Sequence, residues 1–155
     1  MKATYVVLAA VALVVVLLVA FFVTTHLQRG KFFNAVGAND VGTVDQMLAR
    51  GADVDSRTVL GLTPLHLATM DVRRADKDMV ELLISRGADV NAKNETGTTP
   101  LHYAAVGRKD LVELLIASGA DVNARATDGT TPLKTALLYS QKDIAELLRR
   151  HGATE

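Results

Sequence analysis

The chain has 155 residues, enough for one domain, and its 17 basic and 17 acidic side chains balance to a formal net charge of zero. All of the acidic and 15 of the basic residues lie from Lys31 onward, which leaves that part with a net charge of −2. Nothing in this balance suggests nucleic-acid binding, which usually requires a basic face. The absence of cysteine excludes disulfides and thiolate metal sites, and it fits an oxidising or a reducing compartment equally well.

The first predicted element is residues 5–23, an uncharged run of 19 residues that would span about 28 Å as a helix, close to the thickness of the hydrocarbon core of a bilayer. Three interpretations compete: a buried core helix, a cleaved signal peptide and an uncleaved membrane anchor. The run is longer than the apolar part of a signal peptide, and it ends without a convincing small-x-small cleavage site.

The remainder of the chain is built from a repeated pattern. The string Thr-Pro-Leu begins at residues 63, 99 and 131, with His at 66 and 102, and Gly-Ala pairs begin at residues 51, 87, 119 and 152. These glycines are separated by 36, 32 and 33 residues, a period typical of stacked helical hairpins. The chain therefore resembles the ankyrin repeat family over about residues 31–153, with three spaced copies of the Thr-Pro-Leu string.

Each unit makes physical sense on its own residues. Thr99 can cap a helix whose first position is Pro100, and Gly119 supplies the left-handed backbone that ends the second helix. In that second helix, around residues 110–116, leucines fall on one face. One hairpin cannot bury this face alone, so neighbouring copies must stack.

The resemblance implies an all-α solenoid of about four helix-turn-helix repeats, at residues 31–55, 56–91, 92–123 and 124–153, in a domain covering residues 31–155. The first unit lacks Thr-Pro-Leu-His, and the fourth has Lys134 and Thr135 where His and an apolar residue are expected, as suits the two ends of a stack.

A solenoid has no interior that could enclose an uncharged helix. The sequence therefore predicts a three-residue flank at 1–3, a transmembrane signal anchor at 4–24 and a short polar tether at 25–30. The positive charges before the apolar run, Lys2 and the amino group, equal in number those after it, Arg29 and Lys31. The positive-inside rule therefore barely discriminates which end of the run faces the cytoplasm. A short basic start resembles an uncut export signal, and we expect a single-pass membrane protein whose repeat domain is extracytoplasmic.

No catalytic constellation emerges. His66 and His102 occupy the same place in successive units, where the repeat explains them, and Asp53, Asp89 and Asp121 are one position seen three times. No string of the HExxH, GxxxxGK[ST] or GxSxG type is present. The sequence predicts no enzyme, no catalytic residue, no cofactor, no metal and no small-molecule substrate.

Family members bind partner proteins through variable positions around each Thr-Pro-Leu string, so the resemblance implies partner-binding positions here. They are Val59, Leu60, Leu62, Met70, Arg73, Arg74, Glu95, Thr96, Thr98, Val106, Thr127, Asp128, Thr130, Leu138 and Tyr139. Two alternatives stay open. Leu60 and Leu62 could form an exposed patch or fold back as packing, and the three extra residues within 70–76 could form a binding loop or a neutral solvated one.

The predicted function is a membrane-tethered ankyrin repeat module that binds a protein partner and is not catalytic, with residues 5–23 in the membrane and no nucleic-acid partner. The alternative is a soluble repeat protein secreted after signal-peptide cleavage, which assists or protects an exported enzyme.

Overall fold

The computed structural model describes residues 2–70 and 77–154, and within the first helix the side chains of residues 2–13, 22, 23, 25 and 26 lie outside that description. Every regular element in the described residues is an α-helix. The helices are α1 (Lys2–Gly37), α2 (Val41–Ala49), α3 (Pro64–Met70), α4 (Lys77–Ser85), α5 (Pro100–Ala104), α6 (Lys109–Ala117), α7 (Pro132–Leu138) and α8 (Lys142–Arg150).

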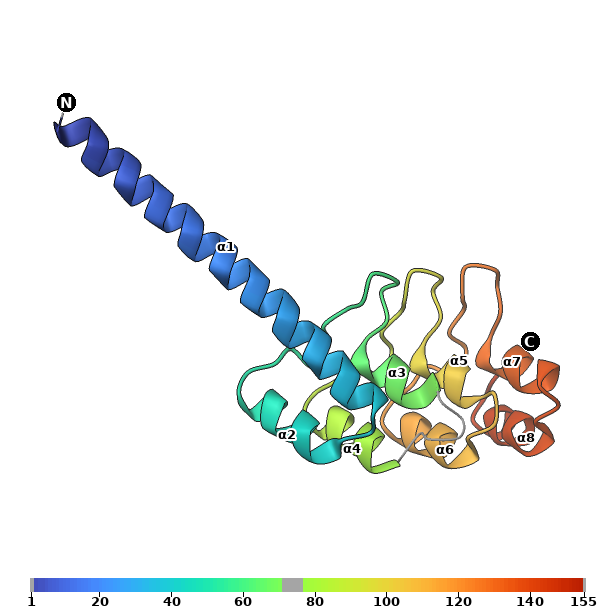
Figure 1. Cartoon of the computed structure of the whole chain (residues 1–155). Helices are drawn as coiled ribbons and strands as arrows, with labels where there is room; N and C mark the ends of the chain where they lie inside the picture. The colour runs from blue at the N-terminus through green and yellow to red at the C-terminus, as the bar shows by residue number, and fades with distance from the viewer. Residues whose placement is uncertain (1, 71–76, 155) are drawn as a thin grey trace.

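The helices form two layers (Figure 1). The end of α1, then α3, α5 and α7 pack in series as the inner layer, while α2, α4, α6 and α8 pack in series as the outer layer. Each inner helix also contacts the outer helix that follows it in the chain. The long turns before α3, α5 and α7 project side by side from one edge of the stack.

The shared interior follows the repeat. Leu65, Leu101 and Leu133 are each the second residue of an inner helix, and each is at most 1% exposed. The expectation that these leucines line up in neighbouring, equivalent helices is confirmed. Full burial of a leucine side chain contributes roughly 1.5–3 kcal/mol, so this column is a main source of the stability of the stack.

The first unit uses the end of α1 as its inner helix. Phe32, Ala35 and Val36 are buried there, opposite Val44 and Leu48 of α2 in the same core. Between these two helices, the carboxylate of Asp40 caps α2 by accepting the Thr43 N–H at 3.0 Å. That hydrogen bond from the Thr43 backbone lowers the pKa of Asp40. The first unit thus forms its inner helix without the Thr-Pro-Leu-His string that it lacks.

Helix α1 continues without interruption through residues 25–30, the segment expected to be a tether. Gly30 does not end the helix, because a single glycine costs only about 1 kcal/mol in a helix interior and no neighbouring atom crowds its Cα. No helix in the described part of the chain is both long and apolar enough to cross a membrane. The span expected at residues 4–24 falls largely on side chains outside the described ones.

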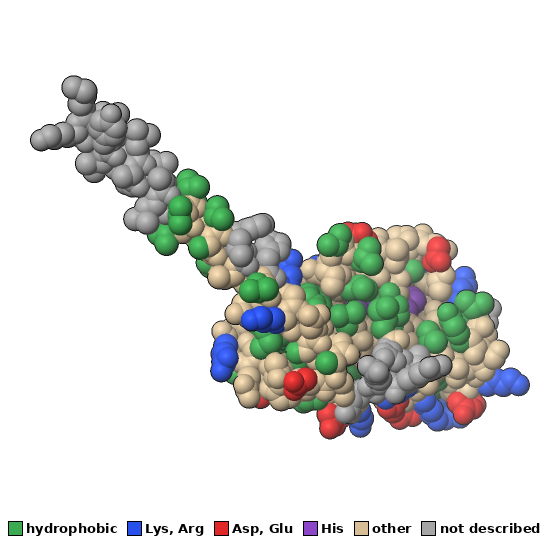
Figure 2. Space-filling view, in the orientation of Figure 1, with side chains coloured by type: hydrophobic (Ala, Val, Ile, Leu, Met, Phe, Trp, Pro, Cys, Tyr) green, Lys and Arg blue, Asp and Glu red, His purple; other side chains and the backbone are tan. Residues whose placement is uncertain are grey.

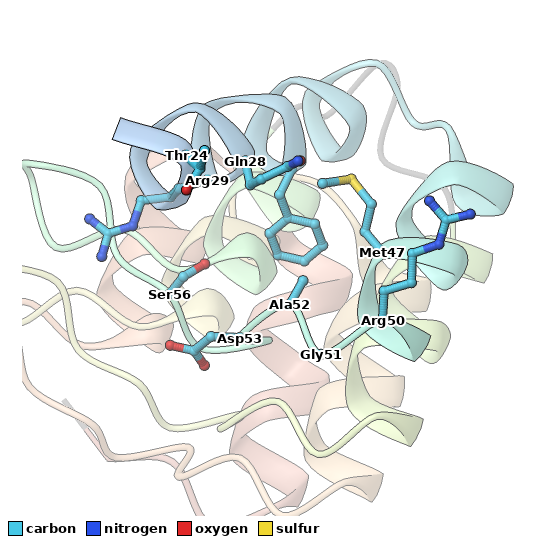
Figure 3. A pocket seen from close by; sticks show the side chains of 10 residues that line it. Thr24, Gln28, Arg29, Met47, Arg50, Gly51, Ala52, Asp53 and Ser56 are labelled. Carbon is cyan, nitrogen blue, oxygen red and sulfur yellow. The ribbon is translucent and has the colours of Figure 1, made fainter. Parts of the chain in front are cut away.

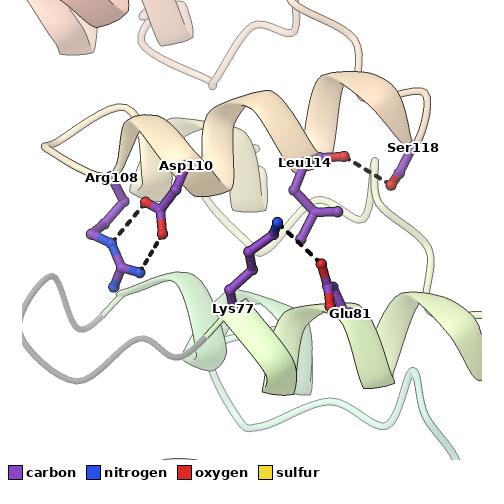
Figure 4. A network of polar contacts seen from close by, with 6 residues as sticks. All are labelled: Lys77, Glu81, Arg108, Asp110, Leu114 and Ser118. Atoms are coloured by element: carbon purple, nitrogen blue, oxygen red, sulfur yellow. Dashed lines mark hydrogen bonds and ion pairs between the residues drawn. The ribbon is translucent and has the colours of Figure 1, made fainter.

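The outer layer carries solvated charge (Figure 4). Lys77 and Glu81 form an ion pair of 3.3 Å along α4, and Arg108 donates to the carboxylate of Asp110 at 2.8 and 3.1 Å at the start of α6. The Arg108 hydrogen bond lowers the pKa of Asp110, although partial burial opposes it. Both side chains of the Lys77–Glu81 pair are about half exposed, and pairs of this kind contribute little stability.

Polar side chains in the loops after the outer helices join consecutive units through hydrogen bonds, which we call the polar clamp. The side chain of Asn91 donates to Gly119 O at 3.0 Å and accepts the Asp121 N–H at 2.8 Å. Asn123 repeats this arrangement with Gly152 O and the Thr154 N–H. At the equivalent place in the first unit, Asp55 accepts the Asp89 N–H but has no amide group to donate. The clamp is thus complete in two units and half formed in the first.

Candidate functional site

The three projecting turns are linked to one another by backbone hydrogen bonds. The Glu95 N–H donates to Leu60 O at 3.3 Å, and the Thr127 N–H donates to Thr96 O at 2.9 Å. Gly61 and Gly97 make this approach possible, because both have positive φ and an added Cβ would lie 3.0–3.1 Å from a backbone nitrogen of the next turn. The turns therefore form one continuous edge that a large ligand could contact.

Buried histidines connect each inner helix to the following turn. Thr63 donates its backbone N–H to Nδ1 of His66 at 3.1 Å, so Nδ1 is unprotonated, and Nε2–H donates to Thr98 O at 3.0 Å. His102 makes the same pair of bonds with the Thr99 N–H and Thr130 O, at 3.2 and 3.1 Å. Both rings are therefore neutral, and both are engaged in structure.

Burial favours this neutral form. Desolvation lowers the pKa of His66 and of His102, although the hydrogen bond to the next turn's carbonyl partly opposes it. A ring with both nitrogens occupied and a lowered pKa stabilises the turns and is not available as an acid or a base. The structural role that the repeat implies for these histidines is what the structure displays.

The fourth unit has no such connection. Lys134 is exposed, and its backbone N–H donates to the hydroxyl of Thr131 at 3.2 Å as part of an ordinary helix cap. The described residues include no further turn beyond the fourth unit that could accept a bond from this position. The departure from the pattern at Lys134 thus coincides with the open end of the stack.

We define the inner surface as the three turn tips together with the exposed ends of α3 and α7. The sequence-predicted binding positions that are exposed on it are Val59, Leu60, Met70, Glu95, Thr96, Thr127, Asp128, Leu138 and Tyr139. Two of its apolar side chains are highly exposed to solvent: Val59 is 92% and Leu138 is 78% exposed. Figure 2 shows hydrophobic side chains gathered on this face over α3, α5 and α7.

The other predicted positions fall elsewhere. Thr98, Thr130 and Val106 are half-buried, and Arg73 and Arg74 lie outside the described residues. Of the two alternatives left open for Leu60 and Leu62, each holds for one residue: Leu60 is 63% exposed and faces solvent, whereas Leu62 is only 8% exposed and packs inward. The hairpin hydrogen bond from the Thr58 N–H to Leu62 O holds Leu62 at the inner end of the turn.

Sequence reasoning missed Leu137, which is 42% exposed. The equivalent residues of the two preceding units, Thr69 and Ala105, are buried. Leu137 is exposed because no further inner helix of the described chain packs against α7, and no signal in the fourth unit's own residues reveals this.

The described residues hold no group of three or more His, Asp or Glu side chains that could bind a metal ion. Within that part of the chain, the site is a surface of shape and apolar contact rather than of reactive groups.

Comparison with known proteins agrees with the repeat. A family model described as ankyrin repeats (3 copies) matches residues 32–126 and, in a second match, residues 72–154. No curated protein matches the chain significantly.

Proposed function

Because the chain belongs to the ankyrin repeat family, whose repeats generally serve as non-catalytic modules for protein–protein interaction, we propose that it binds a protein partner through the inner surface. We further propose that residues 5–23 hold this module at a membrane, with the repeats on the extracytoplasmic side. The partner-binding part and the membrane part rest on different observations and are tested separately.

The observation that carries the binding proposal is the exposure of large apolar side chains. Leu60 at the first turn tip is 63% exposed, and Leu138 and Tyr139 at the end of α7 are 78% and 54% exposed. Exposed apolar groups on one face of a soluble domain favour a partner that covers them. The linked turns and neutral histidines support this role, since they hold the surface in one shape before the partner arrives.

The membrane proposal is supported by the uncharged run 5–23 and by the described part of that run. Val14 to Val19 are 51–62% exposed and Phe21 is 69% exposed, so these side chains find no cover in the repeats. Helix α1 extends away from the stack (Figure 1), which leaves this segment free to meet a bilayer.

Partner binding is tested by cross-linking in native membranes, followed by mass spectrometry and by quantitative binding of the neighbour so identified. Leu60→Asp and Leu138→Asp should each weaken that binding about tenfold or more, because each places a charge in an apolar contact. Gln46→Asp, which adds the same charge to exposed α2 in the outer layer, is the matched control. Equal binding by all three variants contradicts the proposed surface.

The membrane proposal needs two measurements. The intact mass of the native protein should include residues 1–23, whereas loss of about twenty residues would indicate a cleaved signal peptide. Since the chain contains no cysteine, Glu95→Cys creates a single thiol on an exposed turn. A maleimide that cannot cross membranes should label this thiol in intact cells; labelling only after lysis contradicts the extracytoplasmic placement.

A further inference from the structure

The tip of the first turn differs in chemistry from the tips of the other two. Val59, its most prominent side chain, is 92% exposed, and the adjacent Leu60 is exposed as well. The equivalent pairs are Glu95–Thr96 in the second turn and Thr127–Asp128 in the third, all of them exposed and polar. Turns favour glycine, proline and short polar residues, so two large apolar side chains at a tip call for a separate explanation.

The polar tips have a role within the edge that the turns form. Thr127 donates its hydroxyl to Thr96 O at 3.1 Å, and the carboxylate of Asp128 accepts the Thr130 N–H at 2.8 Å. An apolar side chain can form no such hydrogen bond. At 92% exposure, Val59 also packs against almost nothing in its own chain. Neither hydrogen bonding nor internal packing therefore accounts for a valine at this position.

The first turn starts beside the part of α1 that directly follows the uncharged run. A cavity of about 520 Å³ lies between α1 and the loop after α2 (Figure 3). Thr24 and Arg29 line it from α1, Ser56 lines it from the loop, and the three lie next to one another in Figure 3. The run ends at residue 23, so the loop meets α1 within about two helical turns of that end. Val59 follows Ser56 by three residues.

On this side the first turn is bordered by α1 and not by another turn. Arg86 pairs with Asp45 of the preceding unit, whereas Arg50, at the equivalent position, has no preceding unit in the described chain. Figure 1 shows that the turn before α3 is the nearest of the three to α1. The turns project from the side of the stack toward which α1 extends. The first tip is therefore the one that comes closest to a bilayer enclosing residues 5–23.

The side chains of this region suit the boundary of a bilayer. Leu27 is exposed and extends the apolar part of α1 by about one turn past the uncharged run. Arg29 and Lys31 come next on α1, and the exposed Arg57 precedes the tip of the first turn. Basic side chains beside exposed apolar ones are favourable at the level of lipid headgroups.

We infer that Val59 inserts into the headgroup region of the bilayer that holds α1, so that the chain touches the membrane at two places. This inference rests on the proposed membrane placement of residues 5–23, and it holds on either side of the membrane. One valine would not hold a free domain at a bilayer, but α1 keeps the tip next to the lipid, so a weak contact suffices to orient the repeats. Leu60, whose carbonyl accepts the Glu95 N–H, and the end of α7 stay available to the protein partner.

The chain contains no tryptophan, so a single introduced tryptophan reports on one chosen position. The full chain is placed in phosphatidylcholine vesicles at high lipid excess, with or without bromine on the acyl chains, because bromine quenches a tryptophan that contacts lipid. Val59→Trp should be quenched at least about twofold more than Thr127→Trp, with Glu95→Trp between them. Thr127→Trp is the matched control, since it carries the same preference of tryptophan for interfaces at the equivalent position of the third turn.

Phe21→Trp, within the uncharged run, separates this inference from the membrane proposal. Quenching of Phe21→Trp with equal quenching of the three tip variants overturns the tip contact and leaves the membrane placement intact. No quenching of Phe21→Trp contradicts the membrane placement, and the tip contact with it. Emission of Val59→Trp that shifts to the blue but is not quenched by bromine indicates a contact with protein, such as a second copy, and also overturns the inference.

A change in depth tests the geometry of the contact. Four glutamines inserted between Val23 and Thr24 add about 6 Å of polar helix between the uncharged run and the repeats. The insertion leaves the cavity-lining part of α1 in its place against the first unit. Quenching of Val59→Trp should then fall to the level of Thr127→Trp. Unchanged quenching contradicts a contact that depends on the position of the tip along α1.

Discussion

The interior units and the ends of the stack differ at equivalent positions, and each difference follows from a missing neighbour. In the second and third units, His66 and His102 donate to a carbonyl of the following turn. In the fourth unit, after which the described residues include no further turn, the position is the exposed Lys134. In the first unit, Arg50 lacks the preceding carboxylate that Arg86 has. Which residue occupies a repeat position thus depends on contacts with the neighbouring unit as much as on contacts within the residue's own unit.

The largest effect is expected from truncating a side chain in the interior that neighbouring units share. Leu101→Ala should lower the free energy of unfolding by about 2–5 kcal/mol, because Leu101 is 1% exposed and sits between two neighbouring units. Chemical denaturation followed by circular dichroism measures the change. Leu138→Ala, at a position that is 78% exposed, should change it by no more than about 0.5 kcal/mol. Equal losses for the two variants would contradict the described packing.

The histidine connection is the next test. His102→Lys should lower the free energy of unfolding by about 1–3 kcal/mol, since it removes the bond to Thr130 O and leaves buried groups unpaired. The reciprocal change, Lys134→His, should have almost no effect, because its ring would find no following carbonyl. A gain from Lys134→His as large as the loss from His102→Lys would show that the connection does not depend on a neighbour.

Acidification should weaken the interior units. Burial lowers the folded-state pKa of His66 and His102 below the usual value of about 6.5, so the unfolded chain takes up protons first as the pH falls. The contribution of these rings to stability is therefore complete above pH 6.5 and declines below it, toward the lowered pKa. Denaturation curves between pH 7.5 and 5 measure this. A His66→Gln/His102→Gln double variant should be less stable at pH 7.5, but its free energy of unfolding should change less between pH 7.5 and 5.

The smallest expected effect sharpens the comparison of the polar clamps. Asp55→Asn should raise the free energy of unfolding by about 0.5–1.5 kcal/mol, because the new amide can donate to Gly87 O as Asn91 donates to Gly119 O. Asn91→Asp should remove the matching bond and lower stability by a similar amount. Two changes of the same sign in thermal melting would refute the equivalence of these positions.

Much of the fold was predictable from the sequence because the same local pattern recurs. The Thr-Pro starts of α5 and α7, the second helix of the third unit and the buried leucine column all follow from capping, helical periodicity and the 33-residue spacing. The structural role of His66 and His102 also followed from their recurrence.

What escaped prediction depends on neighbours distant in sequence. Leu62 and Leu60 are alike by residue type, yet only the turn geometry buries one and exposes the other. Leu137 and Ser56 sit at positions that the other units fill with small buried residues, and the ends of the stack change their surroundings. The cavity beside Ser56 required knowing that α1 continues through residue 37 and forms its wall.

The continuity of α1 has a mechanical consequence. At 1.5 Å per residue its 36 residues make a rod about 54 Å long, and Phe32 fastens that rod into the first unit. A rotation applied at the N-terminal end of α1 is therefore transmitted to the repeats. The repeats keep a fixed orientation relative to that end, which a flexible linker would not impose. Gly30 makes α1 more flexible at that point. The bending stiffness of the helix at Gly30 therefore determines how closely the orientation of the repeats is coupled to that of the N-terminal end.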